Sequence, residues 1–312
     1  MLKSMKWLII CTIWLMGLFG LWSVISPPSL ALFGVVNLTP TPPIRQTPTG
    51  NQLVYLPMII RSTEAESTPT VTATAPTSGT PLPPGPVTLV TLGDSLTEGD
   101  GDDSPEMGGY PRRLLTQLQT VRPNSTLNNL GKSGWTSNDL INTQLTPAVN
   151  LLNQASGAKV ALVWIGSNDL WGLYEYGPEP MTSQAEAEDL QNYTNNLETI
   201  VSQLRATGAQ VYIALGDDQS KRPCVANPNP TEPTFPATTA QDLALMSIQI
   251  NRYNQAIQAK ATQHGATTVD FYHTDIFVNP VTLAGDGNHP NAAGYDLITT
   301  IWFNALRPAL GN

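Results

Sequence analysis

The sequence predicts an α/β protein in which a parallel sheet lies between two layers of helices. Short apolar runs rich in β-branched residues alternate with segments whose apolar residues recur at helical spacing, and several of the runs end at a glycine. Such runs suit strands that are buried on both faces, and their alternation with helices requires parallel pairing. Five runs occur between residues 87 and 271. We therefore expect a flavodoxin-like three-layer α/β/α sandwich with a five-stranded parallel sheet.

The elements follow in order along the chain. Helical periodicity predicts a helix from Arg112, one from a capping box of Ser183 and Glu186 to a stop at Gly208, and one around Ile250. A last helix is expected to start at Pro290, because proline suits a first helical position. Residues 216–240 form a long proline-rich loop, which we interpret as a lid. The expected strands are residues 87–92, 126–130, 159–165, 210–215 and 267–271.

The composition excludes some classes of partner. The chain has 312 residues, 27 prolines, 12% charged residues and a formal net charge of −9. With no basic stripe to hold phosphates, a nucleic-acid partner is not expected. The two cysteines are Cys11, inside an N-terminal apolar run, and Cys224, in a loop without a nearby histidine. They predict neither a disulfide framework nor a catalytic thiol.

The first 85 residues are typical of a delivery segment. Residues 1–31 combine Lys3 and Lys6 with an uncharged run from 7 to 25 and a small-residue end, which predicts a signal peptide or a signal anchor. Residues 32–85 are rich in threonine and proline and predict a flexible stalk. Residues 86–312 then form the catalytic domain. The expected location is extracellular or at the cell surface, with membrane contact only through the N-terminal apolar segment.

Four loops at the carboxyl ends of expected strands contain candidate functional residues. They contribute Ser95, then Gly131, then Asn168, and finally Asp286 with His289. Because the carboxyl ends of parallel strands share one edge of a sheet, these loops should lie together. Each loop alone is typical of a turn. Together they predict acyl transfer.

The predicted chemistry gives each residue a role. Ser95 would be the nucleophile and His289 the base that removes its proton. Asp286 would orient the imidazole. The oxyanion would be stabilised by the backbone N–H groups of Ser95 and Gly131 and by the side-chain amide of Asn168. Among the other histidines, His264 falls at a helix end, whereas His273 follows the fifth strand and is harder to exclude, although no carboxylate was expected to pair with it.

The four segments resemble the blocks of the GDSL, or SGNH, hydrolase family. They are Gly93-Asp94-Ser95-Leu96, Gly131, Gly166-Ser167-Asn168-Asp169 and Asp286-Gly287-Asn288-His289-Pro290, and they occur in the family's order. The resemblance covers residues 86 to about 310. It implies the flavodoxin-like fold, hydrolysis of esters without a metal or another cofactor, and catalytic roles for Ser95, Gly131, Asn168, Asp286 and His289.

Two functions from different classes follow. The first is an exported serine esterase that acts on a lipid, a lysophospholipid or an O-acetylated carbohydrate. The alternative is a catalytically inactive cell-surface or carbohydrate-binding module on the same fold. Two further features stay open at this point. Aromatic residues near the oxyanion loops suit either a substrate cleft or helix packing, and the acidic run 98–103 is interpreted as a solvated loop rather than a calcium site. The aromatic residues are Trp135, Trp171, Tyr174 and Tyr176.

Overall fold

The computed structural model describes residues 80–104, 108–178, 180–226 and 239–311. Its centre is a five-stranded sheet with the strand order β2-β1-β3-β4-β5, and every neighbouring pair is parallel. The predicted α/β fold with a five-stranded parallel sheet is confirmed. The strands are β1 (Val87–Gly93), β2 (Thr126–Asn129), β3 (Ala158–Trp164), β4 (Gln210–Leu215) and β5 (Thr267–Asp270).

The chain reverses its direction of winding beside β1. From β1 it moves outward to β2, and it then crosses back to β3 on the other side of β1. Ser95 follows β1 and Asn168 follows β3, so the two residues flank the point at which loops diverge to opposite faces of the sheet. Open α/β sheets bind their ligands at such a point.

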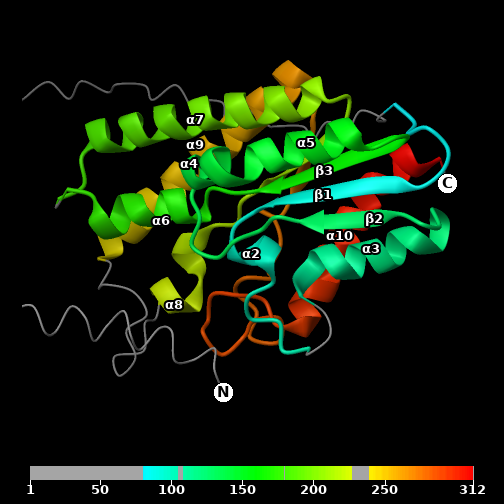
Figure 1. Ribbon diagram of the computed structural model, residues 1–312. Helices are drawn as coiled ribbons and strands as arrows, with labels where there is room; N and C mark the ends of the chain where they lie inside the picture. The colour runs from blue at the N-terminus through cyan, green and yellow to red at the C-terminus, as the bar shows by residue number, and fades with distance from the viewer. Residues whose placement is uncertain (1–79, 105–107, 179, 227–238, 312) are drawn as a thin grey trace, which may run out of the picture. The chain divides into compact units, whose positions relative to one another are not determined.

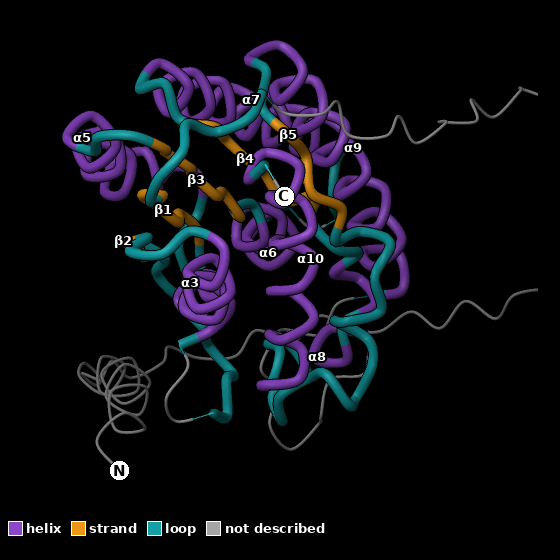
Figure 2. Tube along the Cα trace, turned by 90° about the vertical axis from the view of Figure 1, so that its right-hand side faces the viewer, coloured by secondary structure: helices purple, strands orange, loops and turns teal. Residues whose placement is uncertain are grey.

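One face of the sheet is covered by α5, α7 and α9 (Figures 1 and 2). Val90 and Leu92 of β1 point into this layer, where they join apolar side chains of the three helices in one buried cluster. Tyr193 of α7 stacks on Tyr253 of α9, with ring centroids 4.0 Å apart. The covering helices are α5 (Thr146–Gln154), α7 (Ser183–Ala206) and α9 (Ala240–His264).

The opposite face is covered by α3 (Gly109–Val121) and α10 (Ala292–Leu310), which lie side by side below the sheet in Figure 1. Leu89 of β1 points to this side and completes the alternation expected of a strand buried on both faces. At its centre Trp164 stacks on Phe271, with ring centroids 4.1 Å apart. The two layers hold the strands, and therefore the loops at their ends, in fixed positions.

Two predicted helix starts are wrong by one or two residues. The cap of α7 is Thr182, whose side chain accepts a hydrogen bond from the N–H of Ala185, so the box predicted from Ser183 is shifted. The cap of α10 is Asn291, which accepts from the N–H of Gly294. Pro290 precedes this cap because it pairs with Leu283 in an isolated antiparallel bridge. In both cases the neighbouring side chain satisfies a free helix N–H.

Several helices near the site were not predicted. Residues 137–154 form a continuous helical stretch that includes the π-helical turn η1. Because of this turn, the apolar residues of the stretch do not recur every 3.6 residues. The region expected to be a loop after β4 also contains helical turns, while residues 227–238 lie outside the described ranges. The unpredicted elements are α2 (Ser95–Glu98), α4 (Ser137–Asp139), η1 (Leu140–Leu145), α5 (Thr146–Gln154), α6 (Ser167–Tyr176), η2 (Gln219–Lys221) and α8 (Pro223–Ala226).

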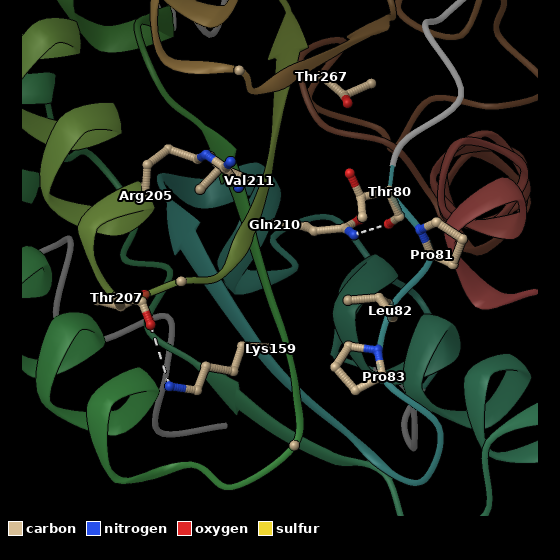
Figure 3. A pocket seen from close by; sticks show the side chains of 13 residues that line it. Thr80, Pro81, Leu82, Pro83, Lys159, Arg205, Thr207, Gln210, Val211 and Thr267 are labelled. Atoms are coloured by element: carbon tan, nitrogen blue, oxygen red, sulfur yellow. Dashed lines mark hydrogen bonds between the residues drawn. The ribbon is translucent and has the colours of Figure 1, made fainter.

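Residues 80–85, the end of the predicted stalk, contact the amino-terminal edge of the sheet. Leu82 is buried, and its N–H donates to the carbonyl of Ala309 at 2.8 Å. A cavity of about 410 Å³ lies beside this segment, where Gln210 donates to the carbonyl of Thr80 and Lys159 points to Thr207 (Figure 3). This edge is opposite to the one that carries Ser95. Residues 1–31, for which a signal peptide or signal anchor is predicted, lie outside the described residues, and none of the helices that are described is long and apolar enough to cross a membrane.

Candidate active site

Ser95 stands at the first turn of α2, directly after β1. Asp94 caps this short helix by accepting the N–H of Leu96 on its Oδ1 at 3.0 Å. Thr97 and Glu98 donate their N–H groups to the carbonyl of Asp94. The turn from strand to helix therefore fixes the serine at the carboxyl edge of the sheet, where its side chain is half-buried.

Asp286 and His289 are held against each other by a tight turn after Leu283. His289 Nδ1 lies 2.6 Å from Asp286 Oδ2, and the N–H groups of Asn288 and His289 donate to Asp286 Oδ1 at 2.9 Å. Burial opposes ionisation of Asp286, but these hydrogen bonds lower its pKa to about 2. The carboxylate is thus ionised in the range in which a histidine acts as a base.

The three side chains meet in space. His289 Nε2 lies 2.9 Å from Ser95 Oγ, although the residues are 194 positions apart. Asp286 binds the other ring nitrogen, so the imidazole is fixed at both ends. The histidine side chain keeps 17% of its surface exposed. This order of hydroxyl, imidazole and carboxylate is the geometry that general-base activation of a serine requires.

The other two histidines contact other carboxylates. His264 Nε2 lies 2.8 Å from Glu198 Oε1 near the end of α9. The expectation that His273 lacks a carboxylate is wrong, because its Nδ1 lies 2.7 Å from Asp270 Oδ2. The pattern Asp-x-x-His occurs twice in the sequence, at 270–273 and 286–289.

Gly131 lies where a side chain would not fit. A Cβ at this position would be within 2.7 Å of atoms of Thr97 and Glu98, so the glycine lets the loop after β2 approach α2. Its N–H donates to Asn129 Oδ1 at 3.0 Å, and Asn129 Nδ2 donates to the carbonyl of Thr97 at 2.8 Å. Gly131 can stabilise an oxyanion only after it releases Asn129. Its predicted role stays a prediction.

Asn168 lies in the first turn of α6. Its Nδ2 donates to the carbonyl of Trp135 at 2.9 Å, which connects the loops after β2 and β3. A primary amide has a second N–H on the same nitrogen. The next residue, Asp169, accepts the N–H and hydroxyl of Ser137, and burial raises its pKa to about 6. These contacts orient the start of α6, while the oxyanion role of Asn168 also stays a prediction.

Gln144, which sequence reasoning did not identify, holds the backbone in front of the serine. Its Oε1 accepts the N–H of Gly93 at 2.9 Å and its Nε2 donates to the carbonyl of Gly93 at 2.8 Å. The side chain is buried and projects from the π-helical turn η1. It thereby binds both backbone groups of Gly93, the last residue of β1.

Arg222 falls in the region that was expected to be a loop after β4, and the structure places it against the turn that carries Asp286 and His289. It is 2% exposed, forms an ion pair with Asp217 at 2.5 Å, and lies 4.5 Å from the ring centroid of Phe277. Its Nη1 donates to Asn288 Oδ1 at 2.7 Å. The N–H of Cys224 donates to the carbonyl of Gly287 at 3.1 Å. Residues 217–224 therefore support the turn that carries Asp286 and His289.

Asp94 is a second buried carboxyl beside the serine. It is fully buried, and its Oδ2 makes no hydrogen bond. Burial raises its pKa to about 7, although the N–H of Leu96 and the neighbouring Arg222 and His289 act in the opposite direction. Titration of this carboxyl should therefore be visible near neutral pH.

The sequence left open the roles of several aromatic residues and of the acidic run 98–103, and the structure shows which of these side chains are buried. Trp171 and Tyr174 are buried, and the Tyr174 hydroxyl donates to Glu186 at 2.7 Å, as expected for helix packing. Tyr176 is 79% exposed. Asp102, expected to be solvated, instead forms a buried ion pair with Arg113. Within the described ranges, no group of three or more His, Cys, Asp or Glu side chains is arranged to hold a metal ion.

Comparison with known families gives the family of the chain. A family model described as the GDSL-like lipase/acylhydrolase family matches residues 91–297. The chain belongs to this family. It is accordingly a hydrolase of ester bonds, and the resemblance noted in its sequence blocks is confirmed. A search of curated proteins found no match.

Solved structures with the same fold include other esterases. The acetylxylan esterase Axe2 from Geobacillus stearothermophilus is 21% identical, with 73% of this chain and 95% of that chain covered and a TM-score of 0.50. A catalytic mutant of Axe2 is 20% identical, with 73% and 95% covered and a TM-score of 0.51. Identities this low establish similarity of fold.

Proposed function

We propose that the protein is an exported serine esterase that cleaves carboxylic esters through an acyl-enzyme. The observation that carries the proposal is the 2.9 Å contact between Ser95 Oγ and His289 Nε2, with Asp286 on the other ring nitrogen. Membership of an ester hydrolase family supports it. Export is proposed from the sequence of residues 1–31 alone.

The proposed reaction has two half-reactions. Ser95 Oγ attacks the ester carbonyl while its proton passes to His289 Nε2, and the imidazolium is stabilised by Asp286. The oxyanion is stabilised by the N–H of Ser95 and by an amide N–H of Asn168, with Gly131 added once its N–H leaves Asn129. His289 then protonates the leaving alkoxide. Water, deprotonated by the same histidine, hydrolyses the acyl-enzyme and restores the serine.

We propose short acyl groups, such as the acetyl esters of a carbohydrate, ahead of long acyl chains. Trp171 and Tyr174, two aromatic side chains suited to lining an acyl channel, are engaged in helix packing. The Ser95 site lies at a rim where Asp286 and His289 are partly exposed. The acetylxylan esterases of similar fold make acetylated xylan a reasonable first substrate to assay. Rates on p-nitrophenyl esters should fall as the acyl chain lengthens beyond acetate or butyrate.

Covalent labelling tests the enzyme assignment. A serine-reactive phosphonate should add to the wild-type protein with a defined stoichiometry, and Ser95→Ala should not react. His289→Ala should react much more slowly, because the hydroxyl keeps its proton. Equal labelling of the wild type and Ser95→Ala would favour the alternative, an inactive surface or carbohydrate-binding module.

A further inference from the structure

Asn288 lies between a buried guanidinium and the reactive nitrogen of His289. Its Oδ1 accepts from Arg222 Nη1 at 2.7 Å, and its Nδ2 lies 3.5 Å from His289 Nε2. Guanidinium groups only donate hydrogen bonds, so Arg222 fixes which end of the amide is the oxygen. The NH₂ group must then face the imidazole.

Arg222 is well suited to hold this orientation. Two of its nitrogens, Nε and Nη2, bind the two oxygens of Asp217 at 2.8 and 2.5 Å, which leaves Nη1 for Asn288. The Asp217 side chain is 5% exposed, and the guanidinium lies over Phe277. A bidentate pair of this kind restricts rotation of the guanidinium.

We propose that Asn288, oriented by Arg222, is a positioning residue that favours the form of His289 with a free lone pair on Nε2. An N–H group facing Nε2 is attracted to that lone pair and repelled by a proton in the same place. The base is thereby kept ready to accept the proton of Ser95. This inference rests on the proposed function, since it concerns the same histidine.

The charged and titratable groups around His289 come from four segments. Asp286 lies in its own turn, Asp94 lies at the end of β1, and Arg222 with Asp217 lies in the segment after β4. The acidic loop after α2 approaches His289 at Gly101, and its carboxylates Asp100 and Asp103 bind the hydroxyl of Ser133 and the N–H of Ala292. Cys224 is close to Asp286, and burial raises the pKa of its thiol to about 11, so it stays neutral. Among these groups, only Arg222 reaches the imidazole through an amide whose orientation it determines.

The substitution Asn288→Asp tests the proposal with little change of shape. It replaces the NH₂ group facing Nε2 by a carboxylate oxygen and leaves an acceptor for Arg222. The imidazolium of His289 should be stabilised, and its titration midpoint should rise by about one pH unit. NMR titration of ¹³C-labelled histidine measures this directly. The protein has three histidines, and the single changes His264→Gln and His273→Gln assign the signals.

Changes at Arg222 separate orientation from general support. Arg222→Lys can still donate to Asn288 Oδ1 and should keep the His289 midpoint near that of the wild type. Asn288→Leu removes the N–H group facing Nε2 without adding or removing a charge, and it should also raise the midpoint. Arg222→Met releases the amide but also removes a positive charge, so Asn288→Leu decides whether the N–H group itself acts on His289. Asn251→Asp, the same chemical change on the exposed surface of α9, is the matched control and should leave the midpoint unchanged.

The outcomes distinguish this inference from the proposed function. The NMR midpoint needs no turnover, so it can be read even if no ester is hydrolysed. In the active enzyme, the acid limb of kcat/KM for Asn288→Asp should move to higher pH by the same amount as the NMR midpoint. If the wild type is active and labelled at Ser95 while Asn288→Asp titrates like the wild type, the positioning role is overturned and the esterase assignment stands.

Discussion

Asp270 and His273 contact each other with the same geometry as Asp286 and His289. Asp270 Oδ2 and His273 Nδ1 are 2.7 Å apart, and the N–H of His273 donates to Asp270 Oδ1 at 3.1 Å. The difference between the two pairs lies in what the second ring nitrogen meets. His289 contacts Ser95, whereas the His273 side chain is 77% exposed and its ring lies edge-on to Tyr272. The molecule therefore contains its own control for the candidate base.

Replacing each histidine in turn tests that difference. His289→Ala should lower kcat/KM by about 10³-fold or more, because the serine loses its base, and adding Ser95→Ala should lower it little further. His273→Ala should leave kcat/KM within about twofold of the wild type. Steady-state rates on p-nitrophenyl acetate measure both. A large loss of kcat/KM in His273→Ala would contradict the assignment of His289 as the base.

The hydrogen bonds between the Gln144 amide and Gly93 predict a second effect on activity. Gln144→Met keeps the length of the side chain but removes both hydrogen bonds to Gly93, which should cost about 2–4 kcal/mol of the free energy of unfolding and lower kcat/KM. Asn254 makes the same two hydrogen bonds to Gly216 at the end of β4, both at 2.9 Å.

Asn254→Leu is therefore the matched control for Gln144→Met. It should lose comparable stability by urea unfolding, yet lose less activity when both variants are assayed fully folded, because Gly93 leads directly to the Ser95 turn. Equal loss of activity in the two variants would contradict a specific role for Gln144 in placing the serine.

The close approach at Gly131 predicts the outcome of adding one methyl group. Gly131→Ala would bring a Cβ within 2.7 Å of backbone and side-chain atoms of α2, so the loop or the helix must shift. We expect a loss of about 1–3 kcal/mol of unfolding free energy together with reduced kcat. Gly172→Ala, where a Cβ meets no atom within 4 Å, should instead leave activity intact and stabilise α6 by up to about 1 kcal/mol. Thermal unfolding and initial rates report both effects.

Asp94 predicts a dependence of stability on pH. Its pKa is about 7 in the folded protein and near 3.8 for a free side chain, so the folded state binds an extra proton between these values. Stability contributed by this proton is complete below about pH 4 and is lost as the pH rises through 7. Asp94→Asn, which never ionises, should therefore gain stability relative to the wild type as the pH rises, by on the order of 4 kcal/mol over the whole range and by about 2–3 kcal/mol between pH 5 and pH 8. Urea unfolding at pH 5 and pH 8 gives the comparison, and an equal difference at the two pH values would refute it.

The three central strands β1, β3 and β4 were predictable because each is a largely apolar run buried on both faces, which leaves little choice of structure. The edge strands β2 and β5 are shorter and only partly buried. The loops that bring Ser95, Asp286 and His289 together follow from parallel pairing, which places their strand ends at one edge. The hydrogen-bond contacts among these side chains are seen only in the folded structure, since residues 95 and 289 are far apart in sequence. The helical stretch before β3 was missed because η1 interrupts its periodicity.

Other features depend on contacts that sequence patterns do not contain. Arg222 belongs to a segment that reads as an irregular loop, and its importance arises only from its position beside Asn288. Thr182 and Ser183 are both good helix caps, and the choice between them depends on which backbone N–H is left free. The second Asp-x-x-His pattern was visible at 270–273, but its distance from the serine is a property of the fold.

The chain enters and leaves this domain at neighbouring points, because Leu82 donates to the carbonyl of Ala309 and Arg122 donates to the carbonyls of Pro83 and Leu310. Both points lie at the edge of the sheet opposite Ser95. The native ends are thus close enough for a short linker to join them, so a circularly permuted form with new ends in an exposed loop is geometrically feasible. For the same reason, attachment of the domain to a solid support through either end would leave the edge that carries Ser95 facing the solution.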